Sequence, residues 1–505
     1  MKKRRPGNSL LYQFCFAFSF LTFQATAQKD LGIFEGQTGV GNPSRPGSVS
    51  YNSQTPVYTI VGAGTNIWAD RDEFHYVWKK LKGNFILRTR ANFIGKGVEE
   101  HRKWGWMVRS SLDPDATHVN GVVHGDGLTS LQYRSTKGGQ TEEIKSSITG
   151  ADVIQLERKG NRYILSAARY GDVFTNSELD SLSLGDEVYV GLFVCSHNKD
   201  VSEKASFSNV RIVIPVPDDF VAYRNYIGSN LEVMDIKTGN SNIIYYSPNS
   251  LQAPNWTKDG RSLIYNSKGL MYRFDLSKKM PVEIPTDFVN NNNNDHVLSF
   301  DGKTLGLSHN NKEDNNQSFV YTVPLSGGKP KRVTDKSPSY LHGWSPDGKF
   351  LVYTGSRNGE FDLYKIPVTG GEEIRLTEAK GLDDGSEYSP DGKYIWFNSN
   401  RTGTMQIWRM KPDGSNQEQM TNGELNDWFP HISPDGKWAV FLSFTKEIPS
   451  GDHPFYKRVY LRMIPATGGK PTVIAYLYGG QATINTPSWS PDSKKIAFVS
   501  NSDNK

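Results

Sequence analysis

The stretch Trp344-Ser-Pro-Asp-Gly-Lys349 recurs, with small changes, six times in the second half of the chain. The aspartates of successive copies stand 42, 46, 44, 44 and 57 residues apart. A period of about 40–50 residues predicts an array of similar structural units, because one such unit cannot bury its apolar face alone. The six aspartates are Asp259, Asp301, Asp347, Asp391, Asp435 and Asp492.

Each copy of this phrase stands between apolar runs of strand length. In the third repeat the run Phe350–Tyr353 follows the phrase, a turn at Ser356–Gly359 comes next, and Asp362–Ile366 forms a further run. Aromatic and β-branched residues in such runs predict strands, and four antiparallel strands joined by hairpins form one blade of a β-propeller. Within the phrase, Pro presets a turn, Asp caps it and Gly supplies a positive φ, so we assign the phrase to the scaffold.

The two ends of this half predict how the ring of blades closes. The last copy is followed by a single strand, Lys495–Ser500, which leaves its blade two strands short. Two unpaired runs of the right type, Asn230–Ile236 and Ser241–Tyr246, precede the first copy. We expect them to complete the last blade, which predicts an all-β, six-bladed propeller without exposed edges over residues 219–505.

These repeats resemble the TolB-like propeller family, and the resemblance covers about residues 219–505. It implies a six-bladed ring built from PD40-type repeats. The same motifs are similar to the propellers of prolyl oligopeptidases and of dipeptidyl peptidase IV. No Gly-x-Ser-x-Gly nucleophile elbow is apparent in this chain, so the sequence does not indicate peptidase activity.

The first 27 residues have the pattern of a secretory signal peptide. Four basic residues lead into the apolar run Leu11–Phe23, and Ala25-Thr-Ala27 supplies the small residues of a cleavage site. The run is short for a membrane span, and Gln13 and Ser19 interrupt it, so we expect cleavage after Ala27. This predicts a periplasmic, cell-surface or secreted protein of a bacterial envelope, with no transmembrane segment after cleavage.

Removal of that segment changes the charge and the cysteine count. The chain has 58 basic and 53 acidic residues, and four of the basic ones precede residue 28, which leaves a net charge of about +1. A nearly neutral chain argues against a nucleic acid as partner. Cys15 leaves with the signal peptide, and Cys195 is expected to be a buried small hydrophobic residue, so no intrachain disulfide is possible.

Residues 30–215 carry no such repeat and are predicted to form a two-sheet β-sandwich. Apolar runs such as Val188–Cys195 alternate with Gly, Asn and Asp. Asn66-Ile-Trp68, Trp104-Gly-Trp-Met-Val-Arg109 and Phe207-Ser-Asn-Val210 resemble a bacterial family of concanavalin-like lectin/glucanase jelly rolls, which often accompanies secreted carbohydrate-active proteins. The acid pair that related glucanases carry along one strand is absent, so hydrolysis is not indicated.

Three tryptophans of this half are candidates for a sugar-binding surface. The alternation along Trp104-Gly-Trp106 predicts that both rings lie on the same face of a sheet, and Trp68 precedes them in the chain. The face of an aromatic ring suits the apolar face of a pyranose. Packing of the rings in the core is the competing interpretation.

Polar residues come directly before the repeated phrase, on the strand that lines the central channel of a propeller. Because these strands surround one axis, their side chains are candidates for a common site. Three imidazoles with carboxylates nearby could hold a divalent cation, whereas a polar, water-filled channel explains the same residues. The binding candidates are Asp384, Glu387 and Asp427, and the metal candidates are His296, His342 and His431.

A run of five asparagines, Asn290–Asn294, precedes the second copy of the phrase. Polar low-complexity runs lack the apolar side chains that a packed element needs. We therefore expect a flexible loop at one rim of the ring.

Two classes of function remain open. The first is an exported binding protein without enzymatic activity, whose partner is a glycan or an envelope protein. The second is a secreted carbohydrate-active lyase or hydrolase with a divalent metal on the three histidines; a propeller lyase that acts on oligogalacturonate is similar to this family and uses a His-rich metal site. The absence of a recognisable acid pair or nucleophile motif favours binding, although propellers host both classes.

Overall fold

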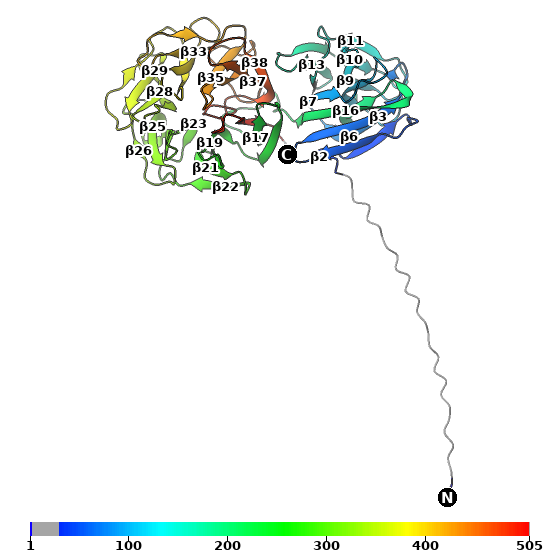
Figure 1. The fold of residues 1–505 in the computed structure, drawn as a ribbon, viewed down its shortest axis with the longest axis horizontal. Helices are drawn as coiled ribbons and strands as arrows, with labels where there is room; N and C mark the ends of the chain where they lie inside the picture. Colours follow the sequence, from blue (N-terminus) through cyan, green and yellow to red (C-terminus); the bar gives the residue numbers. More distant parts are fainter. Residues whose placement is uncertain (3–29, 504–505) are drawn as a thin grey trace. The chain divides into compact units, whose positions relative to one another are not determined.

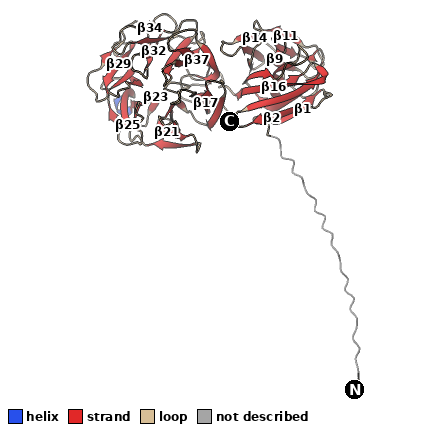
Figure 2. Ribbon diagram, viewed as in Figure 1, coloured by secondary structure: helices blue, strands red, loops and turns tan. Residues whose placement is uncertain are grey.

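β-Strands account for nearly all of the regular structure in the described residues (Figure 2). The fold is that of a computed structural model, which describes residues 1–2 and 30–503; Leu31–Lys505 forms one compact unit. Residues 3–27 of the predicted signal peptide, with Cys15 and the cleavage point after Ala27, lie outside the described residues. Helix in the described part is limited to the 3₁₀ turn η1 (Lys312–Asp314), and no helix there has the length and apolar character that crossing a bilayer demands.

The N-terminal strands form two seven-stranded antiparallel sheets, in agreement with the predicted all-β fold of this half. We call them the first and the second sheet, and together the two-sheet region. The first sheet has the order β1 (Gly36–Val40), β6 (Phe74–Lys82), β15 (Glu187–Cys195), β8 (Lys103–Arg109), β9 (His118–His124), β10 (Thr129–Arg134) and β11 (Glu142–Lys145). The second has the order β14 (Thr175–Leu179), β13 (Arg162–Ala168), β12 (Val153–Lys159), β7 (Phe85–Phe93), β16 (Asn198–Val213), β3 (Val57–Gly64) and β2 (Ser48–Asn52).

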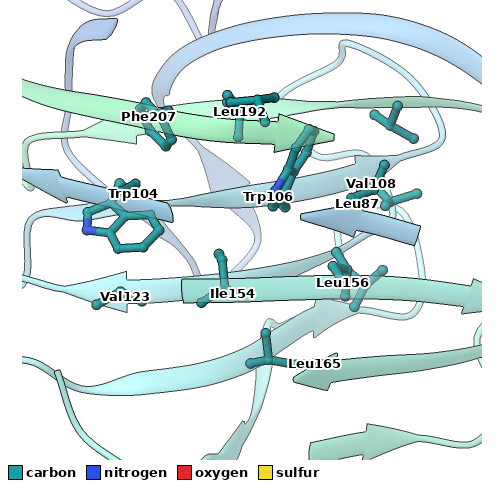
Figure 3. Packing of buried hydrophobic residues seen from close by; sticks show 14 of the residues in the cluster. Leu87, Trp104, Trp106, Val108, Val123, Ile154, Leu156, Leu165, Leu192 and Phe207 are labelled. Atoms are coloured by element: carbon teal, nitrogen blue, oxygen red, sulfur yellow. The ribbon is translucent and has the colours of Figure 1, made fainter. Parts of the chain in front are cut away.

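The two sheets share one apolar core (Figure 3). In β8 the alternate residues Trp104, Trp106 and Val108 belong to this core, because successive side chains of a strand point to opposite faces. Leu87 of β7 and Leu156 of β12 join them from the second sheet. Trp104 and Trp106 therefore do share one face of the sheet, and that face is the interior.

A short hairpin packs on the other face of the first sheet. It consists of β4 (Ile67–Trp68) and β5 (Arg71–Asp72). Asp72 is fully buried and accepts hydrogen bonds from Arg134 Nη2 at 2.7 Å and from Arg134 Nη1 at 3.0 Å. A buried carboxylate is costly unless such partners compensate its charge, so this ion pair fixes the hairpin to β10.

The remaining strands form the blades of a propeller around a common centre (Figure 1). Five blades are four-stranded and the sixth has three strands, which confirms the six-bladed fold. In chain order the four-stranded blades are β19 (Gln252–Trp256), β20 (Ser262–Ser267), β21 (Leu270–Asp275) and β22 (Met280–Ile284); β23 (Asn292–Leu298), β24 (Thr304–Asn311), β25 (Gln317–Pro324) and β26 (Lys331–Arg332); β27 (Ser339–Trp344), β28 (Phe350–Ser356), β29 (Phe361–Pro367) and β30 (Ile374–Arg375); β31 (Asp383–Tyr388), β32 (Ile395–Ser399), β33 (Gln406–Met410) and β34 (Glu418–Gln419); and β35 (Asn426–Ile432), β36 (Trp438–Phe444), β37 (Lys457–Pro465) and β38 (Thr472–Gly479). The sixth blade consists of β39 (Lys495–Asn501), β17 (Ser229–Asp235) and β18 (Ser241–Ser247).

Strands from both ends of the propeller sequence build the sixth blade. β17 pairs with β39 on one side and with β18 on the other. The segment 483–489 lies beside β39, on the side toward the centre of the ring. Hydrogen bonds from Ala497 N to Ser488 O and from Val499 N to Thr483 O hold it there. The predicted closure of the ring by the two runs before the first copy is therefore confirmed.

The repeated phrase forms the same turn in each blade. In the third blade the Ser345 hydroxyl donates to Asp347 Oδ1 at 2.6 Å and accepts from Phe350 N at 2.9 Å. Gly348 has a φ of +71°, in the left-handed region that favours glycine. The corresponding hydroxyl–aspartate hydrogen bond measures 2.6–2.7 Å in all six copies.

The asparagine run is largely part of a strand. Its last three residues begin β23, and Asn292 and Asn294 are buried. Asn292 Nδ2 donates to Gly269 O at 2.9 Å and to Val289 O at 3.0 Å. The prediction of a flexible loop is therefore wrong, because amide side chains that pair with backbone carbonyls can be buried in a sheet.

Polar contacts join the two-sheet region to the propeller. Arg211 of β16 donates from Nη2 to Glu232 Oε2 of β17 at 2.6 Å, and both side chains are nearly buried. Ser500 of β39 donates to Glu232 Oε1 at 2.6 Å. Glu232 thus links the two-sheet region to the two strands that close the ring.

Candidate functional site

The innermost strands of the blades are irregular at the point where the sequence places the candidate site. In five blades the register between the first and second strands shifts shortly before the repeated phrase. A bulge re-aims the side chains around it. Simple alternation therefore does not tell which of these polar side chains face the axis and which face a neighbouring blade.

Glu387 and His431 join neighbouring blades. His431 Nδ1 lies 2.6 Å from Glu387 Oε2, and Glu387 Oε1 accepts from Ile432 N at 3.1 Å. His431 Nε2 lies 2.6 Å from the carbonyl oxygen of Ile484. Both ring nitrogens and both carboxylate oxygens are thus engaged between the fourth blade, the fifth blade and the inner segment of the sixth.

Asp427 is engaged within the fifth blade. It is fully buried and accepts hydrogen bonds at Oδ1 from Ser443 Oγ at 2.7 Å and from Arg462 Nη1 at 3.0 Å. Burial raises the pKa of Asp427 in spite of the Arg462 guanidinium beside it. The structure thus places Asp427 and Glu387 in contacts that stabilise the ring.

His296 does not form a ligand group with the other two candidate metal ligands. It is fully buried, and its Nε2 lies 3.4 Å from the carbonyl oxygen of Ile264 in the first blade. Burial lowers the pKa of His296 to about 4, so the ring is neutral at pH 7. In the described part of the chain, His296, His342 and His431 are not among the groups whose ligand atoms converge.

His342 and Asp384 form the centre of a polar cluster on the inner strands. His342 Nε2 lies 2.9 Å from Asp384 Oδ1, which also accepts from Thr354 Oγ1 at 2.6 Å. Burial alone would raise the pKa of Asp384, but the charge of His342 outweighs it, and the pKa falls to about 2. Burial opposes the charged form of His342 as well, yet the Asp384 and Asp295 carboxylates raise the pKa of His342 above its usual value.

Asp295 of the second blade adds another carboxylate to this cluster. It is buried, and its Oδ2 accepts from Asn293 Nδ2 at 2.6 Å. Burial raises the pKa of Asp295; the Asp384 charge adds to this effect, and the His342 charge opposes it. Asp384 thus contacts the imidazole of His342 and Asp295 acts on its charge, and two carboxylates around one imidazole favour the binding of a further positive charge.

Aromatic and amide side chains border these groups. The Phe429 ring is stacked on His342, with centroids 6.0 Å apart, and His453 packs against Phe429 at 5.4 Å. His453 Nδ1 lies 2.8 Å from Gln481 Oε1. We call Asp295, His342, Asp384 and His453 the inner-strand cluster.

His453 and Phe429 are not among the candidates that the sequence indicated. His453 lies in the connection between β36 and β37, and the copy of the phrase in that blade is followed by the longest spacing, 57 residues from Asp435 to Asp492. This excess length was the available signal for an additional element near the inner strands. Phe429 gives no such signal, because an aromatic residue in an apolar strand usually packs in the core.

The candidate tryptophans have different surroundings. Trp104 is 2% and Trp106 is 0% exposed, so neither presents a ring face to a sugar (Figure 3). Their prediction as binding residues needs this correction, because the face that they share is the one against the second sheet. Trp68, on the β4–β5 hairpin, is 40% exposed, and Lys103 Nζ lies 5.9 Å from its ring.

Comparison with known proteins identifies the family of the propeller half. Residues 314–452 match the PD40 family model, described as the TolB beta propeller domain. The chain is 42% identical over 272 residues to the uncharacterized protein Atu1656 of Agrobacterium fabrum, a match that covers 54% of this chain and 92% of that protein. The chain therefore belongs to the TolB-like β-propeller proteins.

Solved structures give the same class. The structure of a “putative TolB” from Agrobacterium tumefaciens is 41% identical and has a TM-score of 0.53, and the match covers 55% of this chain and 99% of that one. TolB from Acinetobacter baumannii is 17% identical, covers 65% of this chain and 79% of that one, and has a TM-score of 0.41, a likeness too distant to argue from. The matches to Atu1656 and to the putative TolB cover little more than half of this chain, so they give no information about the rest of it.

Proposed function

We propose that this chain is an exported binding protein of the bacterial envelope, whose propeller takes up a polypeptide partner through a cationic group at the inner-strand cluster. The observation that carries this proposal is the contact of 2.9 Å between His342 Nε2 and the buried carboxylate of Asp384, together with the buried Asp295, whose charge raises the pKa of the same imidazole. A lysine ammonium, an arginine guanidinium or an N-terminal amine would supply the missing positive charge through charge-assisted hydrogen bonds. Kinship with TolB-like propellers supports a role in binding, although the fold alone defines no function.

A random-peptide library selected against the full chain tests this proposal. We expect the selected peptides to be enriched in lysine, arginine or free amino termini. Their binding to Asp384→Asn should be at least about tenfold weaker, because a hydrogen bond to a charged group contributes about 1.5–3 kcal/mol.

The control for this measurement is Asp391→Asn in the repeated turn of the fourth blade, where an amide oxygen can still accept the hydrogen bond from Ser389. It should bind the selected peptides as the wild type does. Peptides without a cationic group, or equal binding by wild type and Asp384→Asn, would rule out the proposed recognition.

Export is the second part of the proposal. The basic start, the apolar run and the small residues before position 28 support cleavage after Ala27, so the mature chain would begin at Gln28. Mass spectrometry of the protein from periplasmic, membrane and medium fractions of the source cells tests this. Protein that keeps residues 1–27 in every fraction would contradict it.

A glycan is the second candidate partner, and the exposure of Trp68 is the observation that favours it. We propose that residues 30–215 are a concanavalin-like jelly roll with Trp68 as the ring that stacks on a sugar. A glycan array probed with wild type, Trp68→Ala and Trp68→Phe tests this. Binding that persists in the alanine variant would exclude Trp68, whereas the phenylalanine variant should retain most of it.

The enzymatic alternative requires a divalent cation on His296, His342 and His431. His431 already uses both ring nitrogens, toward Glu387 and toward Ile484. A cation at this place would have to displace contacts that join the blades. We therefore base the proposed function on binding.

A further inference from the structure

The first sheet carries a second cluster of titratable side chains, which the proposed function does not use. His101, His124 and Asp126 each have a potential ligand atom within 4.8 Å of those of the other two. Among the described residues, 1–2 and 30–503, this is the one group of three or more histidine, cysteine or acidic side chains whose ligand atoms lie this close together. We propose that it binds a divalent transition-metal cation of the zinc class.

The register of the sheet explains why these side chains meet. The final pair between β8 and β9 is Lys103 with His124. Beyond this pair the backbone turns, and hydrogen bonds from Gly125 N to Arg102 O at 2.9 Å and from Asp126 N to Glu100 O at 2.8 Å hold the turn between β9 and β10 against the segment before β8. The turn and this segment thereby bring His101, His124 and Asp126 together at one end of the first sheet.

Buried contacts hold this end of the sheet in place. Arg102, next to His101, donates from Nη1 to Glu203 Oε2 at 2.7 Å, and both side chains are nearly buried. Gly125, between His124 and Asp126, lies so close to Arg102 that an added Cβ would come within 2.8 Å of Arg102 Cγ. The backbone that carries the three side chains is therefore arranged before any ligand arrives, which lowers the cost of binding.

Two buried ring nitrogens at the cluster point independently to a ligand. Nδ1 of His124, a residue that is 6% exposed, has no hydrogen-bond partner among the described residues. Nδ1 of His197 also lacks one within the same part of the chain, and its ring centroid lies 5.4 Å from that of His101. Unpaired buried polar atoms cost free energy, and a bound cation with its water would relieve part of that cost.

Two imidazoles and one carboxylate form a donor set that suits zinc, with a fourth position open to water. His101 Nδ1 and Asp126 Oδ2 are 4.0 Å apart, whereas ligands of a tetrahedral zinc ion lie about 3.3 Å apart. These two side chains are 46% and 37% exposed, so small rotations can close the gap. Lys103 pairs with His124 in the sheet, but its ammonium donates to Asn66 Oδ1 at 2.6 Å and to Ile67 O at 3.3 Å.

Zinc binding by the full chain tests the proposal. Protein freed of metal with a chelator is titrated with zinc chloride in a calorimeter, and we expect one zinc ion per chain. His101→Ala and Asp126→Asn should each bind zinc at least about tenfold more weakly. Asparagine can keep the side-chain oxygen that accepts from Leu128 N at 2.9 Å, so Asp126→Asn removes the charge and preserves the turn.

The matched control is Asp115→Asn, an exposed carboxylate elsewhere in the two-sheet region, which should bind zinc as the wild type does. Zinc should also raise the unfolding temperature of wild type and of Asp115→Asn, and not that of the two site variants. Equal unfolding temperatures of the metal-free proteins establish that the variants fold. Absence of zinc binding, or the same affinity in wild type and site variants, overturns the proposal.

Discussion

His296 and His342 occupy equivalent places in neighbouring repeats, yet the pKa values of their imidazoles shift in opposite directions. Burial lowers the pKa of His296 to about 4, since no carboxylate compensates the charged form. Burial acts on His342 too, but Asp384 lies 2.9 Å away and the pKa of His342 rises. For single residues the neighbours, and not the residue type, decide the charge state.

The variant His342→Gln tests this difference. A raised pKa means that His342 contributes a stability that is fully present below its ordinary pKa of 6.5 and is lost as the pH rises through the folded-state pKa. The excess unfolding temperature of wild type over His342→Gln should thus be largest near about pH 5.5 and smaller at about pH 8.5. Thermal unfolding followed by circular dichroism measures it, and a difference independent of pH would contradict the ion pair.

Asp384 has a lowered pKa, so its contribution to the stability of the protein is lost as the pH falls and not as it rises. Its pKa falls from 3.8 to about 2, so its contribution is present above pH 3.8 and is lost as the pH falls toward about 2. Comparison of Asp384→Asn with wild type over this range should show the two unfolding temperatures converging at the acid end. Parallel curves would show that Asp384 is not stabilised as a carboxylate.

Two tryptophans of the two-sheet region should differ in their effect on stability. Trp106→Ala should lower the free energy of unfolding by about 3–5 kcal/mol, because it removes a fully buried indole from a packed core. Trp68→Ala, at a ring that is 40% exposed, should cost less than about 1 kcal/mol. Urea denaturation of the two variants measures both costs, and similar values would contradict the assignment of Trp106 to the core.

The repeated turn is the element that gives every blade its geometry. Gly348→Ala should destabilise the protein by about 1–2 kcal/mol, because alanine resists the left-handed backbone at φ +71°. No heavy atom lies within 4 Å of an added Cβ, so the cost is conformational rather than steric. Gly348→Asn should cost less, because asparagine tolerates this region; equal costs, compared by denaturant midpoints, would indicate another cause.

Glu232 connects the closing strands of the ring to the two-sheet region, so its contacts contribute to the stability of the whole molecule. Burial alone would raise the pKa of Glu232, but Arg211 outweighs it and the pKa is lowered. Glu232→Gln should lower the free energy of unfolding by about 3–5 kcal/mol, because it leaves the Arg211 charge buried without its partner. Thermal unfolding measures this, with Glu283→Gln in β22, an exposed glutamate, as the control; equal stability of both variants would show that the link is unimportant.

The strands of the chain could be predicted closely, whereas the contacts between them could not. The predicted runs Trp104–Arg109 and Val188–Cys195 match β8 and β15 to within one residue, because alternation of apolar side chains is a local property. Asp384 and His342 were found as candidates from their place before the phrase. The pairing of Asp384 with His342 could not be predicted. The bulges in β27 and β31 interrupt the alternation of side chains from which their directions would be inferred.

Local chemistry along the chain was enough to establish the six-bladed ring and its closure, since the turn residues and apolar runs repeat every 40–50 residues and the unpaired strands can be counted. The folded chain was needed to show that Glu387 binds His431, that Trp104 and Trp106 are interior, and that the side chains of His101 and Asp126 lie close together. Such contacts join residues far apart in the sequence and depend on register, bulges and the order of blades, which no local pattern encodes.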